Sequence, residues 1–108
     1  MRKCFLSIAL VTAFLTMASY VCAGDVYSIK IQGAINPPVA GFIGESISRA
    51  EKDNAEALVI LLDTPGGLDT SMRDIIKGIM ESNIPVIVYV YPPGARAASA
   101  GSIILLAS

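Results

Sequence analysis

The sequence predicts an α/β fold built on a parallel sheet, and three observations carry this prediction. Three short β-rich runs are separated by two segments whose apolar residues recur at helical spacing. Strands that alternate with helices imply a parallel sheet with crossover connections. The middle run, residues 57–62, is apolar without interruption, which is typical of a strand buried on both faces. The 108 residues suffice for one domain at most.

The first strand is expected at residues 26–31, where β-formers partly alternate with polar residues, and Gly33 ends it. A helix follows, with Asn36 as the expected N-cap and Pro37 in the first turn. Residues 53–54 are expected to end this helix. The apolar residues at helical spacing form its expected core face: Val39, Ile43, Ile47 and Ala50.

A second crossover helix is expected to start within residues 69–71, where Ser71 and Asp74 form a pair like a capping box. Residues 83–85 contain Asn and Pro and end it. The third strand is expected at residues 86–90. The stripe of the second helix that is predicted to face the core consists of Met72, Ile75, Ile76, Ile79 and Met80.

A stretch of small residues, Gly94–Gly101, follows the third strand and leads into an apolar run, 102–106, that is expected to start a helix. A tight strand-to-helix turn exposes the hydroxyl of a serine, which can then act as a nucleophile, as in the G-x-S-x-G pattern. Ser99 is therefore the candidate nucleophile, although its surroundings fit that pattern only loosely. The alternative is an ordinary turn in which Ser99 caps the helix.

Pro65-Gly66-Gly67 follows the second strand and leaves the sheet at the same carboxyl edge as the serine stretch. Two glycines allow successive N–H groups to point into a cleft, where such donors stabilise an oxyanion. If the second and third strands are neighbours, the two loops face each other. The alternative is a plain tight connection; a phosphate-binding loop is disfavoured because no G-K-[ST] sequence follows.

The first 23 residues read as a signal peptide: a basic start, an apolar stretch, and Val21-Cys22-Ala23 before the expected cleavage at Gly24. The predicted organisation is a signal peptide at 1–23 and one domain at 24–108. An uncleaved membrane anchor and a lipid-modified Cys22 are the alternatives.

The composition excludes several classes of function. Both cysteines, Cys4 and Cys22, lie in the leader, so no disulfide is expected in the mature domain. The chain has no His, which disfavours a zinc or copper site and rules out a Ser-His-Asp triad built from these residues alone. No metal or cofactor is expected. No basic run suggests nucleic acid as a partner.

Residues 62–67 followed by 94–101 closely resemble the membrane-associated serine proteases of the ClpP class, above all the N-terminal protease domain of the NfeD family, relatives of signal peptide peptidase A. The resemblance also includes residues 35–37 and 85–90 and so spans nearly all of the expected mature chain. It implies a ClpP/crotonase-like spiral of β-β-α units, of which this chain is expected to be an N-terminal part with a parallel sheet core.

The resemblance further implies a serine endopeptidase of the Ser-Lys type, with Ser99 as nucleophile and the amides of Gly66 and Gly67 as the oxyanion hole. Its expected substrates are apolar segments of membrane proteins, notably a stomatin-like partner. It implies a homodimer that acts at the membrane. Together with the predicted signal peptide, this gives an exported protein on the extracytoplasmic side as the expectation. The residues expected to line the substrate cleft are Pro65, Leu68, Ala98, Ala100 and Gly101.

The sequence departs from this family in its lysines. The family's base lies well downstream of the serine, whereas this sequence stops nine residues after Ser99 and offers only Lys30, Lys52 and Lys77 after the leader. We therefore expect a truncated protease domain that is inactive alone. The main alternative is a non-catalytic protein-interaction module at the membrane. An acyl-CoA enzyme of the crotonase type shares the fold but does not need Ser99.

Overall fold

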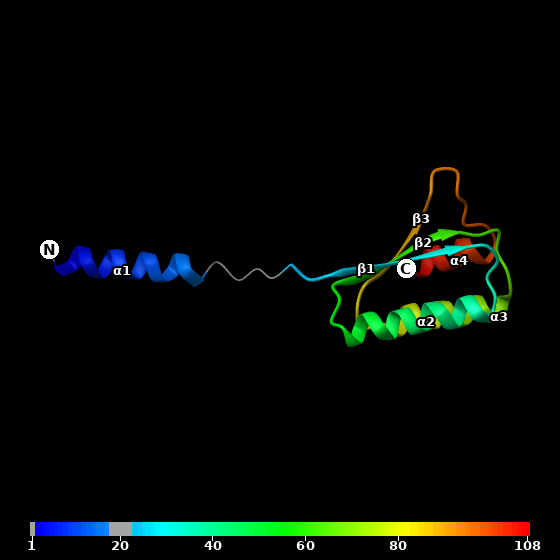
Figure 1. Cartoon of the computed structure of the whole chain (residues 1–108), viewed down its shortest axis with the longest axis horizontal. Coiled ribbons are helices and arrows are strands. Elements are labelled where there is room, and N and C mark those ends of the chain that lie inside the picture. The colour runs from blue at the N-terminus through cyan, green and yellow to red at the C-terminus, as the bar shows by residue number, and fades with distance from the viewer. Residues whose placement is uncertain (1, 18–22) are drawn as a thin grey trace.

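The computed structural model describes residues 2–17 and 23–108. Three strands and four helices follow one another along the chain (Figure 1). In chain order they are α1 (Arg2–Met17), β1 (Val26–Gln32), α2 (Pro37–Lys52), β2 (Ala57–Asp63), α3 (Asp69–Glu81), β3 (Val86–Val90) and α4 (Ala100–Ala107). The predicted alternation of strands and helices is confirmed, and the strand bounds differ from the predicted ones by at most one residue.

The sheet is parallel, with the order β1-β2-β3. Ile29 lies beside Ile60, which lies beside Val88, so the register brings three aliphatic side chains into one row. The central position of β2 explains its uninterrupted apolar sequence, because both of its edges are paired and most of its side chains are buried. The expectation that the second and third strands are neighbours is confirmed.

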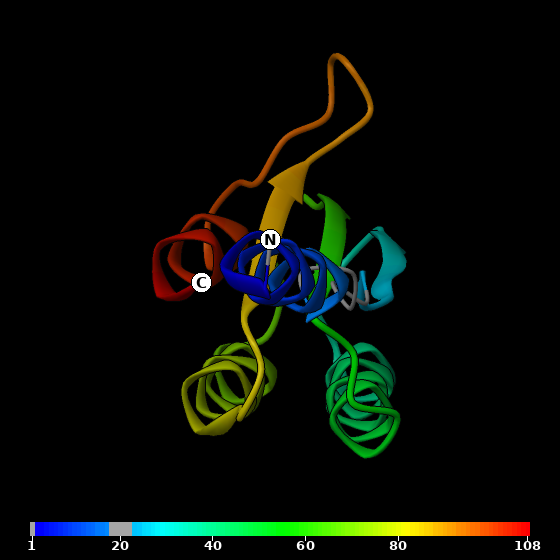
Figure 2. The same cartoon turned by 90° about the vertical axis from the view of Figure 1, so that its left-hand side faces the viewer.

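Helices α2 and α3 cover one face of the sheet, and α4 lies beside β3 (Figure 2). Between the sheet and the helices is one core of buried aliphatic side chains. Ile43, Ile47 and Ala50 of α2 are buried as predicted, and Val39 packs against them. The largest fully buried side chains are Ile35, Ile43, Leu58, Ile60, Leu62, Ile75 and Ile104, together with the polar Thr64.

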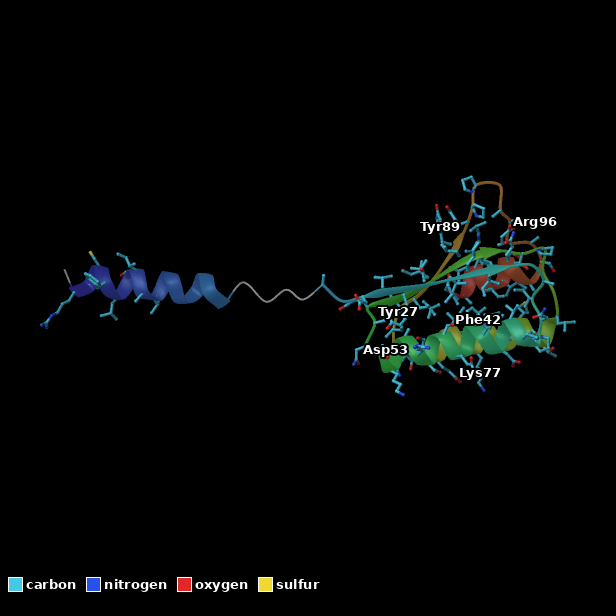
Figure 3. All side chains as sticks on the ribbon, in the orientation of Figure 1. Tyr27, Phe42, Asp53, Lys77, Tyr89 and Arg96 are labelled. Carbon is cyan, nitrogen blue, oxygen red and sulfur yellow. The ribbon has the colours of Figure 1, made fainter. Side chains whose placement is uncertain are left out.

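The ends of α2 are those that the sequence predicts. Asn36 Oδ1 accepts a hydrogen bond from the Val39 N–H at 3.0 Å, and Asp53 closes the helix. At the same end, Tyr27 Oη donates to Asp53 Oδ2 at 2.6 Å (Figure 3). This hydrogen bond raises the pKa of the Tyr27 phenol. The contact ties β1 to the end of the helix that covers it.

Two details of the α3 prediction are wrong. The helix is capped by Leu68 without a side-chain hydrogen bond and begins at Asp69, so Ser71 and Asp74 lie inside it and form no capping box. Ser71 is buried instead. Met80 is predicted to face the core but is 75% exposed, because the buried face of the helix is centred on Met72, Ile75 and Ile79 and Met80 lies at its edge.

Helix α1 comprises most of the predicted leader and lies apart from the sheet and its covering helices (Figure 1). Within residues 2–17 and 23–108, no helix has both the length and the apolar character needed to cross a membrane. The predicted cleavage motif includes residues 21 and 22, which lie outside the described residues.

Candidate active site

Each strand is followed by a short extended segment before its helix, and these segments meet at the carboxyl edge of the sheet. Ile35 pairs with Gly67, and Thr64 pairs with Ala97, both as isolated parallel bridges. A strand, a short extended segment and a helix thus recur three times, as predicted for β-β-α units. The bridges bring the loop after β2 that contains residues 65–67, called here the glycine loop, against residues 94–99 after β3, called here the serine segment.

Ser99 stands at the junction of this serine segment and α4. Its φ and ψ are 53° and −119°, a left-handed conformation that is unfavourable for a residue with a side chain. A strained serine between a strand and a helix is the arrangement that exposes a nucleophilic hydroxyl. The Ser99 side chain is exposed and makes no capping hydrogen bond, which removes the main support for the reading of Ser99 as a helix cap.

Ser102, in the first turn of α4, holds the carbonyl of Ser99 through two hydrogen bonds. The N–H and the Oγ of Ser102 both donate to Ser99 O, at 3.0 and 2.6 Å. Because the Ser99–Ala100 peptide is planar, this fixes the Ala100 N–H on the opposite side, facing out of the helix. Ala100 N–H has no hydrogen-bond partner within residues 23–108, as is usual for the first N–H groups of a helix.

The two glycines of the loop after β2 have different partners. Gly66 N–H donates to Thr64 Oγ1 at 3.1 Å, and Gly66 O accepts from the Ile35 N–H at 2.8 Å. Ile35 O then accepts from Leu68 N–H at 2.9 Å, so Gly67 lies between the two bonds of the bridge with its own N–H directed away from Ile35. In the part of the chain that is described, Gly67 N–H has no partner.

Gly66 lies directly against Ser99. Its φ is +114°, and a Cβ at this position would be 2.7 Å from Ser99 Cβ and 3.2 Å from Ser99 Oγ. Only a glycine permits both this backbone conformation and this approach. The expectation that the two loops face each other therefore agrees with the geometry.

The residues predicted to line the cleft occupy two levels. Pro65 and Leu68 are exposed, and Ala98 is half-buried. Ala100 and Gly101 are buried. Gly101 packs on Thr64, because a Cβ on Gly101 would lie 2.4 Å from Thr64 Cγ2. Ala100 and Gly101 are therefore packed inside the protein, whereas Pro65 and Leu68 lie at its surface.

Residues 91–96 form a loop that projects from the end of β3 (Figure 1). Its base is fixed to β2, because the Arg96 N–H donates to Asp63 Oδ1 at 3.2 Å and Thr64 N–H donates to Arg96 O at 2.7 Å. The labelled Arg96 side chain lies at the carboxyl end of the sheet (Figure 3). The loop therefore joins the serine segment at a fixed point.

The three lysines of the folded part lie away from Ser99. Lys52 is the last residue of α2, at the opposite end of the sheet. Lys77 is exposed on α3, 4.0 Å from Glu81 (Figure 3). Lys30 is exposed on β1, with the whole width of β2 between it and β3. Within residues 23–108, none of these three ammonium groups forms a hydrogen bond with Ser99.

Two residues with a part in this geometry are absent from the predicted oxyanion pair. Thr64 joins the glycine loop to the serine segment, and Ala100 presents a free N–H beside Ser99. Ala100 follows the candidate nucleophile directly, a position whose N–H often serves an oxyanion hole, so this signal was present in the sequence. In residues 2–17 and 23–108, no group of three or more His, Cys, Asp or Glu side chains is arranged to hold a metal ion.

Comparison with known proteins shows the family and the fold. Residues 25–108 match the family model described as NfeD1b, N-terminal domain. Over 109 residues the chain is 49% identical to "Membrane-bound protease PH1510" of Pyrococcus horikoshii, a match that covers 100% of this chain and 24% of that protein. The chain thus spans about a quarter of the length of this curated relative.

Two solved structures of the "1510-N membrane-bound stomatin-specific protease" are similar to the chain. For a serine-to-alanine mutant of that protease, the TM-score is 0.80 at 48% identity, and the match covers 82% of this chain and 42% of the mutant's chain. A lysine-to-alanine mutant in complex with a substrate peptide has a TM-score of 0.78 at 49% identity, covering 82% and 40%. ClpP1 from Listeria monocytogenes has a TM-score of 0.67 at 24% identity, covering 75% and 46%. The predicted ClpP-like fold is confirmed.

Proposed function

The chain belongs to the family of NfeD1b N-terminal domains, and from this premise we propose that it carries the nucleophile and the oxyanion hole of a membrane-associated serine endopeptidase. The observation that carries the proposal is the conformation of Ser99. Its hydroxyl is exposed on a strained turn at the start of α4, and the glycine loop after β2 lies against it. A helix cap or a plain turn requires neither the strain nor the close approach of Gly66.

In this proposal, Ser99 Oγ attacks the carbonyl carbon of a peptide bond and the carbonyl oxygen becomes an oxyanion. The N–H groups of Gly67 and Ala100 are the donors that we assign to this oxyanion, since neither has a hydrogen-bond partner within residues 23–108. The amide of Gly66 is engaged by Thr64, so Gly66 contributes close approach rather than a donor, in contrast to the sequence expectation. When the oxyanion collapses, the C–N bond breaks and the amine leaves with the proton that the general base took from Ser99 Oγ. Water then hydrolyses the acyl-enzyme, which releases the acid product and restores the serine hydroxyl.

We assign the general base to a lysine other than Lys30, Lys52 and Lys77, supplied by a further part of the protein. A lysine serves as a base when burial lowers its pKa enough to leave it neutral near the working pH. The lack of His in the chain and the exposure of its three folded lysines support this assignment. The study of both a serine and a lysine mutant of the 1510-N protease is consistent with a Ser-Lys pair.

The proposed substrate is an apolar segment of a stomatin-like membrane protein. The name of the 1510-N protease, which is stomatin-specific, supports this class of partner. Pro65 and Leu68 are exposed on the loop after β2, and Ala98, next to Ser99, is half-buried. These apolar side chains are compatible with an apolar peptide. We further propose that the protein is exported, acts on the extracytoplasmic side of the membrane and works as a homodimer.

Labelling of the full-length protein with a fluorophosphonate, beside an assay with a fluorogenic apolar peptide, tests the proposal. We expect peptide hydrolysis, and we expect mass spectrometry to locate the label on Ser99, because only an activated serine reacts with this reagent. A protein that binds the peptide but neither cleaves it nor takes up the label is a non-catalytic interaction module, and the protease proposal is then wrong.

Replacing Lys30, Lys52 and Lys77 one at a time with Met is expected to leave kcat within about twofold of the parent value. Each ammonium group is exposed and stands away from Ser99, and exposed surface substitutions usually have small effects. The measurement is the steady-state rate on the fluorogenic peptide. A loss of 100-fold or more in one variant would identify that lysine as the base, and Lys30, on the sheet itself, is the first to examine.

The mature protein is expected to begin at Gly24. The basic start and apolar stretch of residues 1–20 motivate this prediction, and the family match begins one residue later, at position 25. Intact-mass measurement of the protein recovered from membranes decides it. A mass that includes residues 1–23 would show that the leader remains as an anchor.

A further inference from the structure

Thr64 lies at the point where the glycine loop and the serine segment meet. It directly follows β2 and is completely buried, although it is polar. The Thr64 backbone pairs with the serine segment. Thr64 N–H donates to Arg96 O at 2.7 Å, and Thr64 O accepts from Ala98 N–H at 3.1 Å. These hydrogen bonds fix the position of Ala98, the residue just before Ser99, relative to Thr64.

The two branches of the Thr64 side chain point to different elements. Oγ1 accepts from Gly66 N–H at 3.1 Å and lies 3.3 Å from Gly66 O, to which the hydroxyl donates. Cγ2 faces the first turn of α4, where the absence of a side chain on Gly101 makes room for it. One hydroxyl therefore contacts the glycine loop, and one methyl group contacts the helix that begins behind Ser99.

These contacts orient the amide that the proposed oxyanion hole uses. Gly66 C=O and Gly67 N–H belong to one planar peptide group and point in opposite directions. Two donors, Ile35 N–H and Thr64 Oγ1, hold Gly66 O, at 2.8 and 3.3 Å. With the oxygen held on that side, Gly67 N–H is directed to the other side and stays unpaired.

We infer that Thr64 is a positioning residue that sets the Gly67 amide and Ser99 relative to each other. The inference rests on the proposed function for its effect on catalysis, but its geometric content stands on the contacts above. Thr64 is buried and does not touch substrate, so its influence runs through the Gly66–Gly67 peptide and the serine segment. The hydroxyl is required for the connection to the Gly66–Gly67 peptide, and the methyl group contributes to the connection to the serine segment.

The test exploits the two branches with the variants T64V and T64S. T64V keeps the shape of the side chain but removes the hydroxyl, and we expect kcat on the fluorogenic apolar peptide to fall about 10- to 100-fold with KM within about threefold. T64S keeps the hydroxyl and is expected to retain kcat within about threefold. S46A is the matched control, because Ser46 Oγ donates to Phe42 O at 2.7 Å on the remote helix α2.

The second readout is the ¹⁵N–¹H resonance of Gly67, which a general loss of stability does not shift in the folded state. T64V should move this resonance, whereas T64S and S46A should leave it near the parent position. If T64V does not fold, T64A serves in its place with the same expected result.

Unchanged kcat, or an unmoved Gly67 resonance, in the variants that lack the hydroxyl would overturn the inference. Equal losses in the T64V and T64S variants would also overturn it, because packing alone would then explain them. A parent protein without peptidase activity would instead contradict the proposed function, and the Gly67 resonance would still decide whether Thr64 positions the amide.

Discussion

Replacing Ser99 with alanine in the full-length protein is expected to lower kcat for peptide hydrolysis at least about 1,000-fold and to leave the domain folded. The large effect follows from the loss of the exposed Ser99 hydroxyl, which the strained turn holds beside the glycine loop. The fold should tolerate the change because Ser99 Oγ makes no capping hydrogen bond. Its backbone contacts to Ser102 use the carbonyl, which alanine retains.

The measurements are the steady-state rate on the fluorogenic peptide and the thermal unfolding midpoint. S46A, which removes a hydroxyl from the surface of α2, is the control and should match the parent in both. Retention of the parent rate by the Ser99 variant would mean that another group is the nucleophile. A large fall in the unfolding midpoint would mean that Ser99 has a structural role that its contacts do not show.

The fold was predictable because each element is signalled by local residues. The apolar run of β2 predicts a strand buried on both faces, and Asn36 with Pro37 predicts the start of α2. Pairing of β2 with β3 then follows from the short crossover through α3, and it places both loops at one edge. The segment that carries the candidate nucleophile, Ser99, could be located for the same reason, since it follows a strand and precedes a helix.

The remaining parts of the site depend on contacts between residues that are distant in sequence. Ile35 decides the direction of the Gly67 amide, and nothing near Ile35 in the sequence signals a bond to a loop that comes 30 residues later. Thr64 reads in sequence as an ordinary turn residue, and only the bridge to Ala97 shows that it is buried between both loops. The prediction that Met80 faces the core was wrong for a related reason, because a periodic stripe of apolar residues does not reveal where the core ends.

Replacing Gly67 with alanine is expected to have the second large effect, on stability as well as on activity. A Cβ at Gly67 would lie 2.0 Å from Ile35 O and 2.6 Å from Ile35 N, which are backbone atoms that cannot rotate away. The Ile35–Gly67 bridge must therefore open, at a cost on the order of 3 kcal/mol of unfolding free energy. Because the same bridge directs the Gly67 amide, kcat should fall together with stability.

Gly44→Ala is the matched control for this change. Gly44 lies on the exposed side of α2 with nothing within 4 Å of its would-be Cβ, so alanine there should raise the free energy of unfolding by about 0.5–1 kcal/mol. Urea unfolding of both variants, beside the peptidase assay, measures the contrast. G66A is expected to lose both activity and stability, because a φ of +114° is unfavourable for alanine and its Cβ would lie 2.7 Å from Ser99 Cβ. If the Gly67 variant were as stable as the parent and fully active, the bridge would not fix the loop, and the assignment of its amide to the oxyanion would be wrong.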